Sequence, residues 1–135
     1  DIAITFRALS LWYDEVEREG TTSVTILSDS TRQSPMHIEI AGPVTNPTWT
    51  QSVNGAQIAT GKVTATIASG STLHIRTDTD PYQIYVETGG TKTDLYGFSD
   101  FSTQRFMYFE EGENVITCAG ASGLKVTGEV LYETV

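Results

Sequence analysis

The sequence predicts an all-β domain: an antiparallel β-sandwich with one short helical segment. Apolar and polar residues alternate with a period of two in several short segments, which is the spacing of a half-buried strand. Pairs containing glycine, proline or asparagine separate these segments and are typical of turns. Charged residues make up 19% of the 135 residues, less than the roughly one quarter usual for soluble domains, and this disfavours long solvated helices.

Five segments carry the alternation, and each predicts a strand with one buried and one wet face. In the first, Ile38 and Ile40 share one face while His37 and Glu39 share the other. The five segments are 36–40, 62–67, 72–76, 82–86 and 124–130. The pair Asn54-Gly55 predicts a two-residue hairpin, because both residues tolerate a positive φ.

Two segments do not fit this pattern. Residues 14–20 are highly charged and are interpreted as a loop or a short helical turn. Residues 93–102 space their apolar side chains as a helical turn would, so we expect a short helix or 3₁₀ segment at one end of the sandwich. We interpret residues 1–35 as an N-terminal arm or the first strands, and 36–135 as the sandwich body of a single domain. Because the first residue is Asp1, we expect a processed chain or an excised part of a larger protein.

The charge of the chain limits its possible partners, and its cysteine content indicates where it folds. The formal net charge of −9 opposes binding to nucleic acid or to an anionic membrane surface. No run approaches the roughly 18–20 apolar residues of a membrane span. The single cysteine, Cys118, shares a strand face with Ile116 and is interpreted as a core residue. A framework without disulfides indicates folding in a reducing compartment.

Few residues suggest catalysis or metal binding. His37 and His74 fall on the outward phase of their strands and would meet if those strands pair, but neither has a cysteine partner nearby, and we expect no metal site. Asp78 and Asp80 are candidate paired carboxylates for glycan cleavage, although aspartate is also expected at such a turn. With no nucleophile elbow, phosphate loop or dinucleotide motif in the sequence, we expect no cofactor and no enzymatic activity.

Two aromatic residues are candidates for a sugar-binding platform. Trp49 lies among polar residues, and Tyr85 is out of phase with Ile84 and Val86. Exposed tryptophan or tyrosine rings stack on sugar rings in carbohydrate-binding sandwiches, so these two residues predict a ligand platform. The alternative is that strand aromatics cover a sheet or an assembly interface.

An ordered series of short motifs points to a known family. The series comprises Ile-Ala-Gly-Pro-Val-Thr-Asn-Pro at 40–47, Asn-Gly at 54–55, Gly-Ser-Thr-Leu-His-Ile-Arg-Thr-Asp at 70–78, Asp-Leu-Tyr-Gly-Phe at 94–98, Phe-Met-Tyr-Phe at 106–109 and Gly-Glu-Asn-Val-Ile at 112–116. This order resembles the C-terminal domain of the distal tail (Dit) proteins of long-tailed bacteriophages and prophages. The resemblance covers residues 36–132, and it departs from the family pattern at Arg76-Thr77, where the family has Asp-Thr.

The resemblance implies a galectin-like or jelly-roll sandwich that serves as a non-catalytic assembly module of a phage tail tip or baseplate. Its implied partners are other tail proteins and a host cell-surface saccharide, with neither nucleic acid nor membrane among them. It also implies a homo-hexameric full-length parent, assembled in the bacterial cytoplasm and located in the virion. The alternatives from the residues themselves are a carbohydrate-binding module using Trp49 and Tyr85, and a glycan-cleaving enzyme using Asp78 and Asp80.

Overall fold

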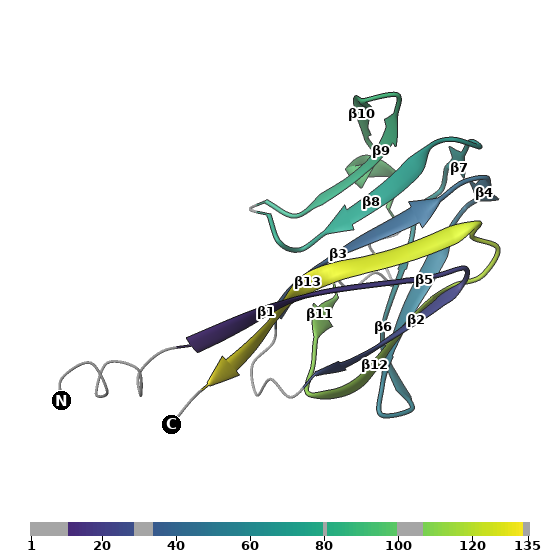
Figure 1. Ribbon diagram of the computed structural model, residues 1–135. Helices are drawn as coiled ribbons and strands as arrows, with labels where there is room; N and C mark the ends of the chain where they lie inside the picture. Colours follow the sequence, from purple (N-terminus) through teal and green to yellow (C-terminus); the bar gives the residue numbers. More distant parts are fainter. Residues whose placement is uncertain (1–10, 29–33, 80, 100–106, 134–135) are drawn as a thin grey trace, which may run out of the picture.

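The computed structural model describes residues 11–28, 34–79, 81–99 and 107–133 of the chain. Two antiparallel sheets pack face to face as a β-sandwich (Figure 1). The larger sheet has the strand order β1-β13-β3-β8-β9-β10, with β11 also paired to β3, and the smaller sheet has the order β2-β12-β5-β6. Strands β4 and β7 form a separate pair. The all-β sandwich fold is therefore confirmed.

The larger sheet contains β1 (Leu11–Gly20), β3 (Ser34–Ala41), β8 (Thr72–Arg76), β9 (Gln83–Thr88), β10 (Thr91–Asp94), β11 (Tyr108–Phe109) and β13 (Gly123–Glu133). The smaller sheet contains β2 (Ser23–Ser28), β5 (Thr48–Val53), β6 (Ala56–Lys62) and β12 (Gly112–Cys118), and the separate pair is β4 (Val44–Thr45) with β7 (Thr66–Ile67). In the described part of the chain, one 3₁₀ turn, η1, covers Tyr96–Phe98. No helix among the described residues is long and apolar enough to cross a membrane.

Strand β3 lies inside the larger sheet and pairs with both β13 and β8. Its alternation sends Met36, Ile38 and Ile40 into the core, where each is at most 1% exposed. At its start, the Met36 N–H donates to Thr77 Oγ1 (2.9 Å), and the Thr77 N–H donates to the Met36 carbonyl (3.0 Å). The buried Thr77 hydroxyl also lies 2.9 Å from the Met107 carbonyl. Thr77 thus fixes the register of β3 against β8.

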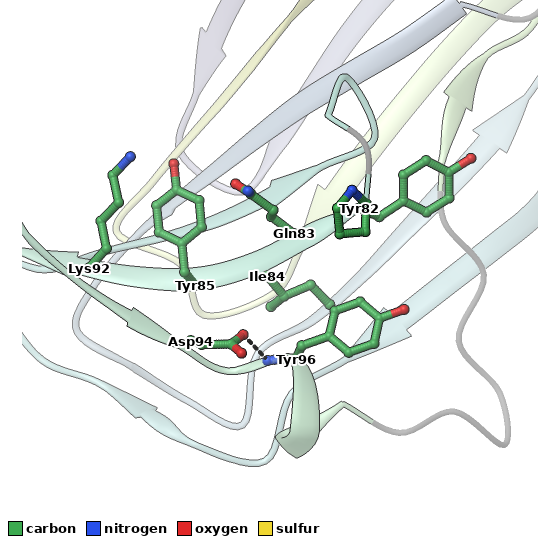
Figure 2. A pocket seen from close by; sticks show the side chains of 8 residues that line it. Tyr82, Gln83, Ile84, Tyr85, Lys92, Asp94 and Tyr96 are labelled. Carbon is green, nitrogen blue, oxygen red and sulfur yellow. Dashed lines mark hydrogen bonds between the residues drawn. The ribbon is translucent and has the colours of Figure 1, made fainter.

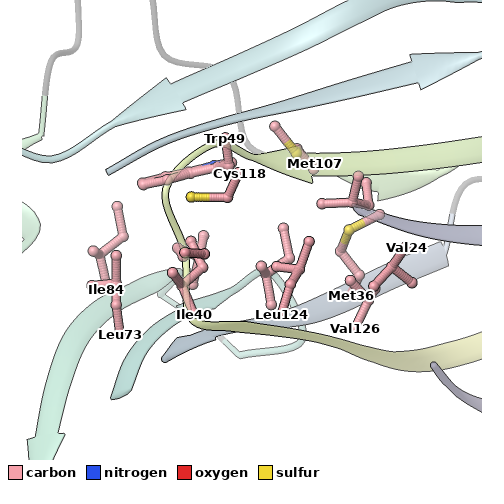
Figure 3. Packing of buried hydrophobic residues seen from close by; sticks show 14 of the residues in the cluster. Val24, Met36, Ile40, Trp49, Leu73, Ile84, Met107, Cys118, Leu124 and Val126 are labelled. Carbon is pink, nitrogen blue, oxygen red and sulfur yellow. The ribbon is translucent and has the colours of Figure 1, made fainter. Parts of the chain in front are cut away.

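The inner face of the smaller sheet contributes Trp49 from β5, which is 1% exposed (Figure 3). Its cross-strand partner on β6 is Gly61. A Cβ added at Gly61 would lie 2.5 Å from the indole Nε1 and Cε2 atoms, closer than van der Waals contact allows. The glycine is therefore required by the ring that covers it.

A buried amide network fixes the start of β12. The Asn114 Nδ2 group donates to the carbonyls of Glu110 (2.8 Å) and Gly112 (3.2 Å). Its Oδ1 atom accepts from the Glu110 N–H and from Gln51 Nε2, both at 3.0 Å. Gln51 also donates to the Tyr108 carbonyl (2.7 Å). Both amide side chains are at most 1% exposed, and these partners offset the cost of burying them.

Two sequence-based interpretations are wrong. Residues 14–20 belong to β1 rather than to a loop or helical turn, because β1 pairs along its whole length with β13 and charged side chains are common on an edge strand. Residues 62–67 do not form one strand, because the Val63 and Thr64 N–H groups donate to the carbonyls of Pro47 and Phe98. Val63 and Ile67 are nevertheless fully buried, as the alternation predicted.

Other interpretations are confirmed. Asn54 and Gly55 have φ values of 50° and 88° and form the β5–β6 hairpin turn. Cys118 is a free, fully buried core residue, and burial raises the pKa of its thiol. The helical segment is the three-residue turn η1, while residues 100–102 of the predicted segment lie outside the described residues. The division into residues 1–35 and 36–135 stays a prediction; of residues 1–35, those at 11–28 form β1, its turn and β2, and those at 34–35 begin β3.

Substitution of Gly61 tests the packing of Trp49. We expect Gly61→Ala to lower the free energy of unfolding by about 1–3 kcal/mol through overpacking, and to cost much less in a Trp49→Leu background where the ring is gone. Urea denaturation of the two single variants and the double variant measures this coupling. Gly97→Ala is the matched control, since a Cβ there meets nothing within 4 Å. Equal costs of Gly61→Ala in both backgrounds would contradict this packing.

Candidate functional site

The outer face of the larger sheet carries a row of polar and aromatic residues aligned across its strands. Glu39 on β3 lies directly opposite His74 on β8, and His74 lies opposite Tyr85 on β9. The row continues on both sides, and its order is Glu19, Lys125, Glu39, His74, Tyr85 and Asp94. A neighbouring row contains Glu17, Thr127, His37, Arg76 and Gln83. Side chains aligned this closely across strands interact directly.

The two histidines meet at the centre of these rows. His37 Nε2 lies 2.8 Å from His74 Nδ1, which is a hydrogen bond. The two imidazole rings stack with their centroids 5.0 Å apart. The Tyr85 ring also stacks on His74, with a centroid distance of 4.7 Å. His74 is only 6% exposed, although it points away from the core. The sequence placed both histidines outward, but it did not indicate that neighbours would bury His74.

Two glutamates flank His74. Its Nε2 atom lies 3.2 Å from Glu87 Oε1, and its Nδ1 atom lies 3.7 Å from Glu39 Oε1. The approach to Glu87 is not aligned as a hydrogen bond, so it is a contact between a carboxylate and the polar edge of the ring. A proton on His74 Nε2 faces the Glu87 carboxylate favourably, whereas a lone pair there would be repelled. We therefore assign the proton of the histidine pair to His37 Nε2, which donates to His74 Nδ1.

Ion pairs surround the histidines. Lys125 Nζ contacts Glu17 and lies 3.7 Å from Glu39 Oε2. The Arg76 guanidinium donates two hydrogen bonds of 2.9 Å to the carboxylate of Asp78. This bidentate pair lowers the pKa of Asp78 and raises the pKa of Arg76. Arg76 and Lys125 are therefore each paired with a carboxylate.

The environment keeps both histidines neutral. Burial lowers the pKa of His37, and the nearby Arg76 charge lowers it further, against an opposing effect of Glu39. Burial also lowers the pKa of His74, outweighing Glu39 and Glu87, which act to raise it. The unperturbed imidazole pKa is 6.5, so both rings are neutral at pH 7. Neutral imidazoles are hydrogen-bond donors, acceptors and metal ligands.

Beside this group, a hollow of about 630 Å³ opens at β9, β10 and η1. Figure 2 shows Tyr82, Tyr85 and Tyr96 around it, together with Lys92 and Asp94. Asp94 Oδ1 accepts a hydrogen bond of 2.9 Å from the Tyr96 N–H, and this contact holds the start of η1. The Lys92 ammonium group lies 5.0 Å from the centroid of the Tyr85 ring, a cation–π contact.

The two predicted platform residues have different positions. The prediction that Trp49 is exposed is wrong, because its indole is in the core against Gly61. Thr48 and Thr50, its immediate polar neighbours, lie on the opposite face of β5, as the neighbours of a buried strand residue do. Tyr85 faces away from the core, as predicted, and lines the hollow, but it is only 7% exposed. Its role in ligand binding stays a prediction.

The predicted carboxylate pair is described only in part. Asp78 is bound to Arg76, and Asp80 lies outside the described residues. Sequence reasoning did not single out Glu39 or Glu87, which the sheet places beside His74. The available signal was the spacing His37-x-Glu39 in an alternating strand, which puts both side chains on one face.

The neutral histidines predict a pH-dependent stability. Their folded-state pKa values lie below 6.5, so the unfolded chain takes up protons first as the pH falls. This stabilisation is complete above about pH 6.5 and is lost as the pH falls from there through the folded-state pKa values. We expect the urea midpoint to fall between pH 7.5 and 5.5, and to fall less in the double variant His37→Gln, His74→Gln. A parallel fall in both proteins would contradict the assignment.

Comparisons with known proteins identify the fold. No protein-family model matches the chain, and no curated protein sequence matches it. Among solved structures, the SPP1 Dit protein, described as a paradigm of the hub adsorption apparatus of phages that infect Gram-positive bacteria, matches with a TM-score of 0.65 at 11% identity. That match covers 88% of this chain and 48% of the SPP1 chain.

Two structures of the phage P2 baseplate in its activated conformation also match. The structure with Ca has a TM-score of 0.58, and the structure with Sr has a TM-score of 0.57, both at 15% identity. They cover 94% and 96% of this chain, and 38% of the matched chain in each case. This chain therefore spans less than half the length of the proteins it resembles. The resemblance to distal tail proteins is confirmed in the fold: these residues form a β-sandwich similar to part of the SPP1 Dit hub protein and of a P2 baseplate protein.

Proposed function

We propose that this chain is a structural module of the tail tip or baseplate of a long-tailed bacteriophage. The observation that carries the proposal is that three phage baseplate or hub chains share its fold over 88% to 96% of its length. In this role the domain contacts other tail proteins within the virion and catalyses no reaction. The engagement of Asp78 by Arg76 favours this role over hydrolysis, because a carboxylate held ionised by arginine is a poor general acid.

Immunogold electron microscopy tests the proposed location. Antibodies raised against the purified chain should label one end of the tail on virions of the source phage or induced prophage, because a hub or baseplate component occurs only there. Mass spectrometry of the same purified particles should detect peptides of the chain. Particles that lack these peptides, or that carry label along the tail tube or on the head, would contradict a tail-tip role.

A second candidate function is recognition of a saccharide on the host cell surface. The hollow beside Tyr85 favours it, because tyrosine rings can pack against the apolar faces of sugars while Asp94 and Lys92 offer hydrogen bonds to hydroxyl groups. Tyr82, which is 37% exposed, is the more accessible ring. Tyr85 supplies the edge of its ring, because His74 stacks on its face.

Titration with cell-wall polysaccharide of the host tests this second function. We expect Tyr82→Ala and Asp94→Asn each to weaken binding by about tenfold, because a lost stacking or hydrogen-bond contact costs about 1 kcal/mol or more. Phe98→Ala is the matched control, since Phe98 is 57% exposed on the adjacent η1 and does not line the hollow. Absence of binding by the unmodified chain, or equal loss in all three variants, would contradict a sugar site here.

A further inference from the structure

A group of three potential metal ligands lies on the outer face of the larger sheet. Among the residues that the structure describes, His37, Glu39 and His74 are the one group of three or more histidine, cysteine or acidic side chains whose ligand atoms come together. These atoms all lie within 4.8 Å of one another. The group is built on two paired strands, β3 and β8, so its backbone positions are fixed by the sheet.

We propose that His37, Glu39 and His74 bind a divalent first-row transition metal ion, Zn²⁺ in the first place. Two imidazoles and one carboxylate are a ligand set that Zn²⁺ takes at sites that leave a fourth position open. His37 and Glu39 are partly exposed beside the buried His74, so water can occupy that position. Ca²⁺ is disfavoured, because it requires about six to eight oxygen ligands.

The ligand distances are close to those that the ion requires. Zinc–nitrogen bonds of about 2.0–2.1 Å in a tetrahedral site place two ligand nitrogens about 3.3 Å apart. His37 Nε2 and His74 Nδ1 are 2.8 Å apart, and Glu39 Oε1 is 3.7 Å from His74 Nδ1. To bind the ion through Nε2, the neutral His37 ring carries its proton on Nδ1 instead, so both rings stay neutral and no proton is lost. The two ligand nitrogens then move apart by about half an ångström. The Glu39 carboxylate, whose ligand atom lies within 4.8 Å of both nitrogens, turns toward the ion.

Glu87 supports the site from the opposite side of His74. A histidine that binds metal through one nitrogen usually donates its other N–H to a carboxylate, which orients the ring and increases its basicity. With His74 Nδ1 on the metal, Nε2 carries that N–H, and its nearest acceptor is Glu87 Oε1 at 3.2 Å. This Nε2 atom is buried and makes no aligned hydrogen bond. Bound metal would fix the proton on Nε2 and strengthen this contact.

The surrounding charges are compatible with a cation. Three carboxylates act on the two histidines, those of Glu39, Asp78 and Glu87, and the cations beside them are Arg76 on β8 and Lys125 on β13. Arg76 is bound to Asp78, and Lys125 contacts Glu17. The excess of carboxylates over cations in this group favours the binding of a divalent cation.

Metal titration of the untagged, full 135-residue chain tests the proposal. After removal of metals with chelator, we expect one Co²⁺ per chain to give the absorption bands of tetrahedral cobalt, and Zn²⁺ to displace it. Calorimetry should give a Zn²⁺ affinity that falls at least tenfold in His37→Gln and in Glu39→Gln. We expect Glu87→Gln, which removes only the supporting carboxylate, to weaken binding by about 10- to 100-fold.

Glu19→Gln is the matched control, because Glu19 lies in the same cross-strand row as Glu39 but outside the ligand group. Its affinity for Zn²⁺ should equal that of the unmodified chain. Circular dichroism and the melting temperature without metal establish that each variant is folded, and Zn²⁺ should raise the melting temperature only where the ligands are intact. Absence of saturable binding at micromolar Zn²⁺ would overturn the proposal. So would folded His37→Gln and Glu39→Gln variants that bind Zn²⁺ as tightly as the unmodified chain.

Discussion

The register between β3 and β8 is the constraint on which the rest of this molecule depends. Thr77 fixes that register through hydrogen bonds to both backbone groups of Met36, and its hydroxyl also reaches the Met107 carbonyl beside β11. A shift of one residue in β3 would exchange its two faces. Ile38 and Ile40 would then leave the core, and His37 and Glu39 would enter it. The apolar core and the polar outer face are therefore set by the same contact.

The smaller sheet is fixed by different means. Trp49 and Gly61 determine how closely β5 and β6 approach, and the Asn114–Gln51 network determines where β12 begins. These features face inward or are buried, and they stabilise the sandwich without creating a site. The outer face of the larger sheet lies outside this core, and its stacked His37, His74 and Tyr85 rings form a separate layer.

The parts of the fold that the sequence predicts well are those where local pattern and tertiary environment agree. Strand β3 has a strict alternation, and Asn54-Gly55 has a backbone preference that few other turns satisfy. The charged strand β1 was misread because its partner, β13, is about a hundred residues away in sequence, and local composition does not indicate that partner. Trp49 was misread for a similar reason: its polar neighbours point away from it, and only the position opposite Gly61 shows that the ring is covered.

The candidate site was predictable only in part, because it depends on strand pairing. Alternation puts His37 and Glu39 on one face of one strand, and His74 on the outer face of another. Only the pairing of β3 with β8, and of β8 with β9, brings Glu39, His74 and Tyr85 into one row. No local pattern in the sequence specifies which strands are neighbours. The burial of His74 between Tyr85 and Glu39 could therefore not be predicted from the sequence.

That burial also separates the outer face from an ordinary solvated surface. An imidazole that is 6% exposed, with one nitrogen lacking an aligned partner, costs free energy that a threonine at the same position would not. A buried polar side chain that lowers stability in this way is expected where the residue serves a function rather than the fold. The phage structures match at 11% to 15% identity, a level at which the sandwich is shared and the outer residues are not constrained to be. The features that distinguish this chain from proteins of the same fold are therefore expected among the histidine, glutamate and tyrosine side chains on the outer face of the larger sheet.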